Sequence, residues 1–423
     1  MPRGQVVTEF RSKLHDDDFA PGLPRSENRQ FYPALDGLRA VAVLMVFYQH
    51  YLASYYPSLN WGWTGVDFFF VLSGFLITGI LYDTRNSVHR YRHFYIRRSL
   101  RIFPLYYGVL LAGLLLSPVF HWVWHPAWIL WPLYLGNYAR FIWLCDWYQN
   151  TGVLDHLRSS LPYKSPFFLY LGHFWSLCVE EQFYLVWPWI IYTVGDRVRL
   201  RNFCLTICSL CLVARVIVAC FLSPAYLNAE ILYRLTPLRA DALLLGGALA
   251  LMLRGPEAHT IVRLTRPAVP FFVGGFVVFE LLYRHTIHHL YHPVAGAPVL
   301  DTLGYSLIDL FAGMLIILSL NPSGLSYRLF TVAPLRRLGQ VSYGFYIFHD
   351  LPHIAYALLV ARMIGGHSID ARKPVALIAF FATLALSFLS FRYFESPFLR
   401  LKQRYAPTDS QLTKHVITQV DPA

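Results

Sequence analysis

The chain has 423 residues, of which 56% are hydrophobic, 17% are aromatic and only 14% are charged. A soluble domain of this length carries far more charge, so the composition excludes an ordinary soluble protein and indicates a polytopic membrane protein. The formal net charge of +12 is typical of membrane proteins, which concentrate Lys and Arg in cytoplasmic loops. It does not by itself indicate nucleic acid or an acidic ligand.

The six cysteines do not form a predicted disulfide framework, because Cys204, Cys208, Cys211 and Cys220 fall in one apolar segment. The spacing of the first three matches an iron-sulfur motif. Their setting in a lipid-embedded helix instead favours thiols that pack as small apolar side chains.

The first 30 residues are polar, and no cleavable signal peptide is visible before the first apolar run near Phe31. About ten apolar segments beyond them are long enough to cross a membrane as helices. We therefore predict an all-α, polytopic membrane bundle of about ten transmembrane helices. The segments cover residues 33–55, 65–82, 102–118, 175–194, 203–222, 236–253, 268–284, 303–320, 342–364 and 375–394.

A further aromatic stretch, 122–143, is broken by Pro126 and Pro132 and is rich in Trp and Tyr, as interfacial segments are. If it does not cross, the arginine-rich loops and both termini fall on one side. We therefore expect an interfacial or re-entrant segment in the second outward-side connection, the long loop 119–172. The predicted organisation is a cytoplasmic tail, a membrane domain and a second cytoplasmic tail, at residues 1–30, 31–397 and 398–423.

The first predicted span carries Arg39 near one end and His50 near the other. Eleven helical positions at ~1.5 Å each place them roughly 16 Å apart along the axis, about half the hydrocarbon thickness. Ionisable residues inside a membrane are costly and indicate function. One helix therefore has the reach to serve both faces of the membrane. The alternative is that both side chains only snorkel to the two interfaces.

Carboxylates accompany His50 in the predicted outer layer. Asp67 lies at the outer start of the second span, and Glu180 and Glu181 enter the fourth span from the same side, after His173. A histidine held by a carboxylate can abstract a proton from a hydroxyl, so one of the three carboxylates is expected to orient His50. The alternative is that they cap helix starts, where the macrodipole favours anions.

The opposite face is basic. Arg97, Arg98 and Arg101 precede the third span and, with Arg39, are expected to bind phosphates through charge-assisted hydrogen bonds. The topology alone also predicts such a cluster, except for Arg39, which lies well inside its span. Arg239 and Asp241 are expected to form a local ion pair.

Other side chains in the predicted spans are assigned to acceptor binding or structural support. His349 and Asp350 place another His and Asp in the apolar layer, where a structural hydrogen bond between helices competes with a chemical role. The support residues are His173, Trp175, Ser73, Tyr343 and His349.

Six motifs occur in order along the chain. They are Leu35-Asp-Gly-Leu-Arg39 with His50, Gly65-Val-Asp-Phe-Phe-Phe-Val-Leu-Ser-Gly-Phe, Arg97-Arg-Ser-Leu-Arg-Ile-Phe-Pro, Trp175-Ser-Leu-Cys-Val-Glu-Glu-Gln-Phe-Tyr, Ser342-Tyr-Gly-Phe-Tyr-Ile-Phe-His349 and Glu395-Ser-Pro. Together they resemble the bacterial acyltransferase family 3, from about residue 31 to about 400. The resemblance implies about ten spans and acyl transfer from a cytoplasmic coenzyme A thioester to an extracytoplasmic sugar hydroxyl. It also implies His50 as the catalytic histidine, Arg39 as a donor contact and Glu180 in the extracytoplasmic site.

The expected function is transfer of an acetyl or other short acyl group from acyl-coenzyme A to a surface glycan or glycoside, in the bacterial inner membrane. Acetyl-CoA is then a co-substrate, and no tightly bound cofactor or nucleic-acid partner is expected. A proton-coupled transporter or flippase is the alternative, since intramembrane His, Arg and carboxylates also mark ion paths. No metal is expected. His285, His288, His289 and His292 in an outward loop are interpreted as solvated imidazoles, with a metal site as the alternative.

Overall fold

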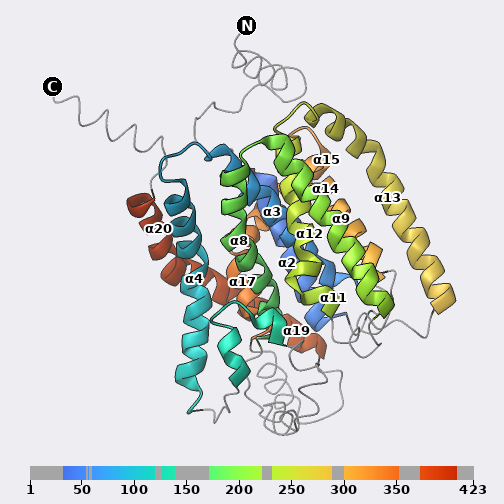
Figure 1. Ribbon diagram of the computed structural model, residues 1–423. Helices are drawn as coiled ribbons and strands as arrows, with labels where there is room; N and C mark the ends of the chain where they lie inside the picture. Colours follow the sequence, from blue (N-terminus) through green and yellow to red (C-terminus); the bar gives the residue numbers. More distant parts are fainter. Residues whose placement is uncertain are drawn as a thin grey trace.

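A computed structural model describes residues 32–53, 56, 60–119, 126–139, 171–221, 231–287, 300–351 and 372–406. Every regular element among these residues is helical, which confirms the predicted all-α class. Figure 1 shows long helices running roughly side by side, with α2, α3 and α12 at the centre, α4 and α20 along one edge and α13 at the other.

The central helices bring together segments that are distant in sequence. Helix α3 packs against both α2 and α12, and α2 also contacts α16, α15, α17 and α19. The central elements are α2 (Pro33–Tyr51), η2 (Gly62–Thr64), α3 (Gly65–Asp83), η6 (Gly172–Phe174), α8 (Trp175–Val194), α12 (Thr236–Met252), α16 (Ala333–Gln340) and α17 (Ser342–Phe348).

The remaining helices surround this centre. The longer ones are α4 (Arg90–Leu116), α9 (Arg197–Phe221), α13 (Ala258–Ile287), α14 (Tyr305–Ser319), α19 (Arg372–Leu389) and α20 (Ser396–Tyr405). The shorter ones are η3 (Pro126–Leu130), η4 (Gly136–Tyr138), α11 (Ile231–Arg234), η7 (Leu300–Gly304), α15 (Leu325–Phe330) and η8 (Ser390–Glu395).

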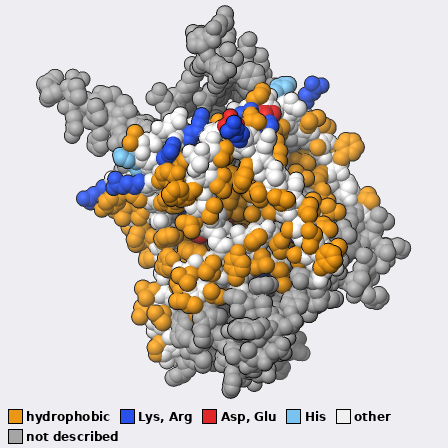
Figure 2. Space-filling view, viewed as in Figure 1, with side chains coloured by type: hydrophobic (Ala, Val, Ile, Leu, Met, Phe, Trp, Pro, Cys, Tyr) orange, Lys and Arg blue, Asp and Glu red, His pale blue; other side chains and the backbone are white. Residues whose placement is uncertain are grey.

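The outer helices expose apolar side chains, among them Leu115, Val213, Phe271 and Leu386. Figure 2 shows a broad hydrophobic belt on the visible face, with Lys and Arg gathered at its upper edge. Such a belt suits the hydrocarbon of a bilayer, and helices satisfy their own backbone groups there. The molecule is therefore a multi-pass membrane protein.

Six helical segments of the described residues are long and apolar enough to cross a membrane. Three more predicted spans form α2, α8 and α12, whose residues are mostly buried and include polar side chains that contact neighbouring helices. Of the remaining predicted span, 342–364, only residues 342–351 are described, so the predicted count of ten stays a prediction. The six segments are Gly62–Asp83, Arg90–Leu116, Arg197–Phe221, Ala258–Val278, Asp301–Ser319 and Pro374–Lys402.

The segment 122–143 is described in part. Its described residues form the short 3-10 helices η3 and η4. The interfacial or re-entrant position stays a prediction, as do the two cytoplasmic tails. Residues 1–31 and 407–423 lie outside the described residues, and the start of the predicted second tail, 398–405, belongs to α20.

Two glycines let α3 and α12 approach closely. A Cβ on Gly74 would collide with the carbonyl oxygen of Leu243, and a Cβ on Gly246 would collide with that of Val71. Small residues at helix crossings are a common way to pack membrane helices without a hydrophobic driving force. This crossing fixes α3, which carries Asp67 and Ser73, against the helix that carries Arg239 and Asp241.

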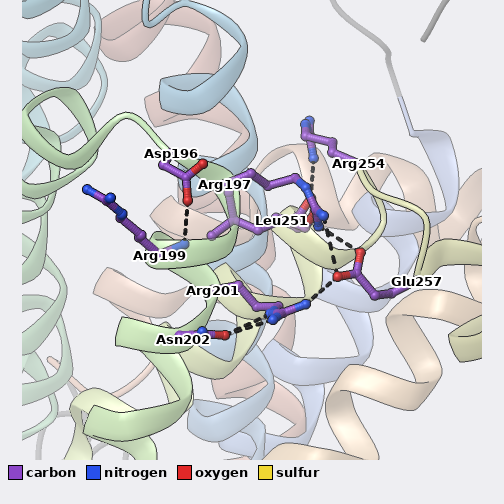
Figure 3. A network of polar contacts seen from close by, with 9 residues as sticks. Asp196, Arg197, Arg199, Arg201, Asn202, Leu251, Arg254 and Glu257 are labelled. Atoms are coloured by element: carbon purple, nitrogen blue, oxygen red, sulfur yellow. Dashed lines mark hydrogen bonds and ion pairs between the residues drawn. The ribbon is translucent and has the colours of Figure 1, made fainter. Parts of the chain in front are cut away.

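Ion pairs tie the helix ends together at one side of the bundle. Figure 3 shows Arg197 and Arg201 of α9 directed at Glu257, which precedes α13. The Arg197 Nη1 and Glu257 Oε2 atoms lie 2.7 Å apart, and Arg254 Nη2 lies 2.7 Å from Asp83 Oδ2. Partial burial raises the pKa of Glu257, but its hydrogen bond to Arg197 outweighs this, so the pKa lies below its ordinary value.

Candidate active site

The central feature of the candidate site is a pair formed by His50 and Asp350. His50 lies in the last turn of α2, and Asp350 follows the end of α17. The His50 Nδ1 and Asp350 Oδ2 atoms are 2.9 Å apart, with side-chain exposures of 28% and 4%. A neutral imidazole that donates from Nδ1 to the carboxylate keeps Nε2 free to accept a proton. The pair thus has the arrangement of a general base with its orienting carboxylate.

Two further imidazoles surround this pair. The His349 ring lies 4.9 Å from that of His50 and 4.8 Å from that of His173, measured between centroids. His173 Nδ1 lies 3.9 Å from Asp350 Oδ2. The structure therefore brings together His50, His173 and His349, which the sequence placed in one layer without showing that they meet.

Backbone carbonyls fix the two buried imidazoles. His349 Nδ1 donates to the Tyr346 carbonyl oxygen at 2.6 Å, and His173 Nε2 donates to that of Ile347 at 3.1 Å. The Tyr346 hydroxyl donates to the His173 carbonyl oxygen at 2.8 Å. Only His50 of the three remains partly exposed, which makes it the imidazole that a substrate can reach.

The carboxylates that the sequence offered as partners of His50 have other partners. Asp67 forms an ion pair with Arg239, and Glu181 faces Arg98 at 3.9 Å. The prediction that one of the three orients His50 is wrong in this structure, because Asp350 occupies that position. The expected local pair of Arg239 with Asp241 is also wrong.

Glu180 and Glu181 belong to a second polar cluster, between α3, α4 and α8. The Arg98 guanidinium lies 3.7 Å from the centre of the Tyr184 ring, and Glu180 interacts with Arg98 and Tyr184. The Ser73 hydroxyl hydrogen-bonds that of Tyr184. These contacts assign Ser73 and Glu180 to the interior of the bundle rather than to the imidazoles.

Three of the four predicted donor-binding arginines gather at this second cluster. Arg39 interacts with Arg98, and Arg101 interacts with both. Arg39 Nη1 lies 3.2 Å from Asp36 Oδ1, and its side chain is 23% exposed. Asp36, Glu180 and Glu181 face these guanidiniums, so the three arginines share the cluster with three carboxylates. The predicted phosphate contact stays a prediction.

Arg97 does not join this cluster. Its Nε donates to the Ala406 carbonyl oxygen at 2.8 Å, at the end of α20. This contact ties α4 to α20, so Arg97 has a structural partner where the sequence predicted a phosphate contact.

The remaining support residues are structural in this arrangement. Trp175 is buried, with its ring 4.7 Å from that of Tyr233 and 5.9 Å from that of Phe70. The Tyr343 hydroxyl donates to the Ile102 carbonyl oxygen at 2.8 Å. Among the described residues no group of His, Cys, Asp and Glu side chains is suited to a metal ion; His288, His289 and His292 lie outside them.

Asp350 is the candidate site residue that sequence reasoning did not select as a partner of His50. The sequence did single out His349-Asp350 as polar residues in an apolar layer. Nothing in the local pattern shows that Asp350 faces His50, since this depends on how α17 packs against α2.

Comparison with known proteins identifies the family that the chain resembles. The sequence model of the acyltransferase domain matches residues 32–392. The peptidoglycan O-acetyltransferase OatA of Listeria monocytogenes is 30% identical over 384 residues, which cover 88% of this chain and 56% of the relative. The putative peptidoglycan O-acetyltransferase YrhL of Bacillus subtilis is 30% identical over 390 residues, with the same two coverages.

A third relative, the O-acetyltransferase OatA of Staphylococcus aureus, is 26% identical over 385 residues, which cover 89% of this chain and 58% of the relative. The chain thus spans little more than half the length of these relatives. No solved structure matches it significantly.

Proposed function

Because the chain belongs to the acyltransferase domain family, we propose that it is a membrane O-acyltransferase that moves an acetyl or other short acyl group from acyl-coenzyme A to a carbohydrate hydroxyl. Three of its relatives carry O-acetyltransferase in their names. The observation that carries the proposal is the His50–Asp350 pair, because it supplies a base at the only partly exposed imidazole of the three.

His50 acts as general base in this proposal. Its Nε2 takes the proton from the acceptor hydroxyl while that oxygen attacks the thioester carbonyl carbon. The carbon–sulfur bond then breaks, and the coenzyme A thiolate leaves and takes up the proton that His50 accepted, which regenerates the neutral imidazole. Asp350 holds the tautomer and stabilises the imidazolium, and such base catalysis contributes typically about 10²- to 10⁴-fold. An acyl-histidine relay is the runner-up.

The donor is bound by Arg39, Arg98 and Arg101. Coenzyme A carries phosphates, and guanidiniums bind phosphate through paired, charge-assisted hydrogen bonds. Arg39 and His50 lie on one helix, roughly 16 Å apart at ~1.5 Å per residue. The helix thereby reaches a cytoplasmic donor at one end and an extracytoplasmic acceptor at the other.

The acceptor is a carbohydrate of the cell envelope, and the relatives' names favour peptidoglycan. Surface glycans such as O-antigen or exopolysaccharide contain the same hydroxyl chemistry. We place the protein in the bacterial inner membrane with both termini in the cytoplasm, because arginines gather at one side of the hydrophobic belt.

Thiol release tests the proposal against the transporter alternative. Purified protein with acetyl-CoA and muropeptide is expected to release free coenzyme A and to produce acetylated glycan detectable by mass spectrometry. His50→Ala is expected to abolish both, whereas Asp83→Asn, at an exposed ion pair, retains them. Proton-coupled movement of a glycan across vesicles without thiol release would contradict the proposal and favour the transporter.

A further inference from the structure

Five charged side chains are buried in the bundle away from the His50–Asp350 pair. They come from α3, α9, α12 and α14, and none is more than 3% exposed. Charges at membrane depth are expensive and are retained for a reason. We call this set the buried charge cluster; its members are Asp67, Arg215, Arg239, Asp241 and Asp309.

Four members form two ion pairs. Arg239 pairs with Asp67, and its guanidinium also lies 4.4 Å from the centre of the Tyr305 ring. Arg215 Nη2 lies 2.6 Å from Asp241 Oδ2. Each arginine therefore neutralises one carboxylate.

Ser306 joins the second pair to α14. Arg215 Nη2 donates to the Ser306 hydroxyl at 2.7 Å, and that hydroxyl donates to Asp241 Oδ2 at 3.4 Å. Arg215 Nη1 also donates to the Leu238 carbonyl oxygen at 2.6 Å. The pair is thus held on three helices.

Asp309 is the fifth member and has no arginine of its own. It is 1% exposed, and neither carboxyl oxygen has a hydrogen-bond partner in the described part of the chain. It interacts electrostatically with Asp241, Arg215 and Arg239. Its carboxyl group therefore lies against the charged pairs without completing one.

The charges of the cluster do not balance. Two guanidiniums face three carboxylates, which leaves one negative charge in a setting where an uncompensated buried ion costs several kcal/mol. An extra positive charge removes this cost, and a carboxyl group that binds a proton becomes neutral. We propose that the buried charge cluster is a proton-binding site and that Asp309 carries the proton.

The groups that face Asp309 support this assignment. Helix α9 contributes Arg215, with Cys208 and Cys211 also in range, and α12 contributes Arg239 and Asp241. Helix α3 contributes Asp67 through its pair with Arg239. None of the described residues of α13 or α15 adds a charge to these interactions. A monovalent cation bound beside Asp309 would be repelled by the two guanidiniums. A proton instead bonds to the Asp309 carboxyl group and makes it neutral.

Infrared spectroscopy reads the proton directly. A protonated carboxylic acid gives a carbonyl-stretch band that an ionised carboxylate lacks, and the band shifts in D₂O. The difference between wild-type protein and Asp309→Asn is expected to show the loss of one such band, because other buried carboxyl groups cancel. Asp83→Asn, at an ion pair near the surface, is the control and is expected to leave the band unchanged. An identical spectrum for wild type and Asp309→Asn would overturn the proposal.

A second variant tests the charge balance and covers the case in which Asp309→Asn does not fold. In Asp241→Asn two guanidiniums face two carboxylates, so the cluster is neutral without the proton and the same band is expected to disappear. Retention of the band in Asp241→Asn would contradict proton sharing by the cluster. A loss of the wild-type band when NaCl replaces choline chloride would show that Asp309 binds a cation instead. The readout does not depend on acyl transfer, so its failure is distinct from failure of the proposed function.

Discussion

His50 Nδ1 lies 2.9 Å from Asp350 Oδ2, although the two residues come from the first and the ninth predicted spans. Asp350 is almost fully buried, whereas His50 keeps more than a quarter of its side chain exposed. The carboxylate is thus the buried member of the pair, and the imidazole is the exposed one. Substitutions of Asp350 and of His50 therefore test two different roles.

Asp350→Asn tests the orienting role. An amide can donate to the imidazole as well as accept from it, so the wrong tautomer becomes accessible and the imidazolium loses its counter-charge. We expect turnover to fall by about 10²-fold or more while donor binding is kept. The measurement is the steady-state rate of coenzyme A release. Asp350→Glu is the matched variant that keeps the charge, and its activity is expected to exceed that of the amide. Unchanged turnover in Asp350→Asn would remove Asp350 from the mechanism.

Arginine variants test the donor site. Losing a charge-assisted contact costs about 1.5 to 3 kcal/mol, so Arg39→Ala is expected to weaken coenzyme A binding by roughly tenfold to a hundredfold. Arg97→Ala is the control, because this arginine contacts Ala406 and not the cluster of Arg39, Arg98 and Arg101. Binding measured by titration calorimetry decides. Equal weakening by Arg39→Ala and Arg97→Ala would contradict a local phosphate contact.

His50→Ala is expected to lose turnover rather than donor binding. Donor affinity is expected to be retained because the proposed phosphate contacts lie at the other end of α2, while turnover falls by about 10²- to 10⁴-fold. The same titration of coenzyme A, paired with a rate measurement, checks this. Normal donor binding in Arg39→Ala together with lost binding in His50→Ala would reverse the assignment of donor and acceptor to the two ends.

The α3–α12 crossing gives a stability prediction. Gly246→Ala places a methyl group against the Val71 carbonyl oxygen, and overpacking of this kind costs typically about 1 to 3 kcal/mol. Gly275→Ala on α13, where no atom lies within 4 Å of the new methyl group, is the control. Thermal unfolding in detergent is expected to show a lower midpoint for Gly246→Ala only. Equal unfolding midpoints for Gly246→Ala and Gly275→Ala would contradict tight packing of α3 against α12 at Gly246.

The ion pairs of Glu257 give a pH prediction. Its pKa in the folded protein lies below the ordinary value of 4.5, so the unfolded state binds the proton more readily. The stabilisation is present above the unfolded-state pKa and is lost as the pH falls through the lower, folded-state pKa. Glu257→Gln is therefore expected to lack this acid-dependent loss. Unfolding midpoints followed from about pH 7 down to about pH 3 will compare the two proteins, and parallel curves would contradict the assignment.

The fold class was predictable because lipid imposes long apolar helices, whose signal is local. Arg39 and His50 could also be selected from the sequence, because a charged or polar residue inside an apolar segment is visible without knowledge of its partner. The partners of these residues could not be predicted from the sequence. Asp67 stands in the same layer as His50 but lies on the face of α3 that meets α12, and only the packing of whole helices separates that carboxylate from Asp350. The count of spans stayed open because α2 and α8 carry polar side chains that hydropathy penalises and α12 has only 17 residues. In addition, residues 352–364 of the ninth predicted span lie outside the described residues.

The central position of α2 has a consequence for how the protein is made. This helix leaves the ribosome before any other described helix, yet α15, α16, α17 and α19, which pack against it, are synthesised much later. Until they arrive, its arginine, aspartate and histidine lack these four helices as neighbours. We therefore expect the nascent helix α2 to be held in a polar environment, such as an insertase channel, until the second half of the chain is translated.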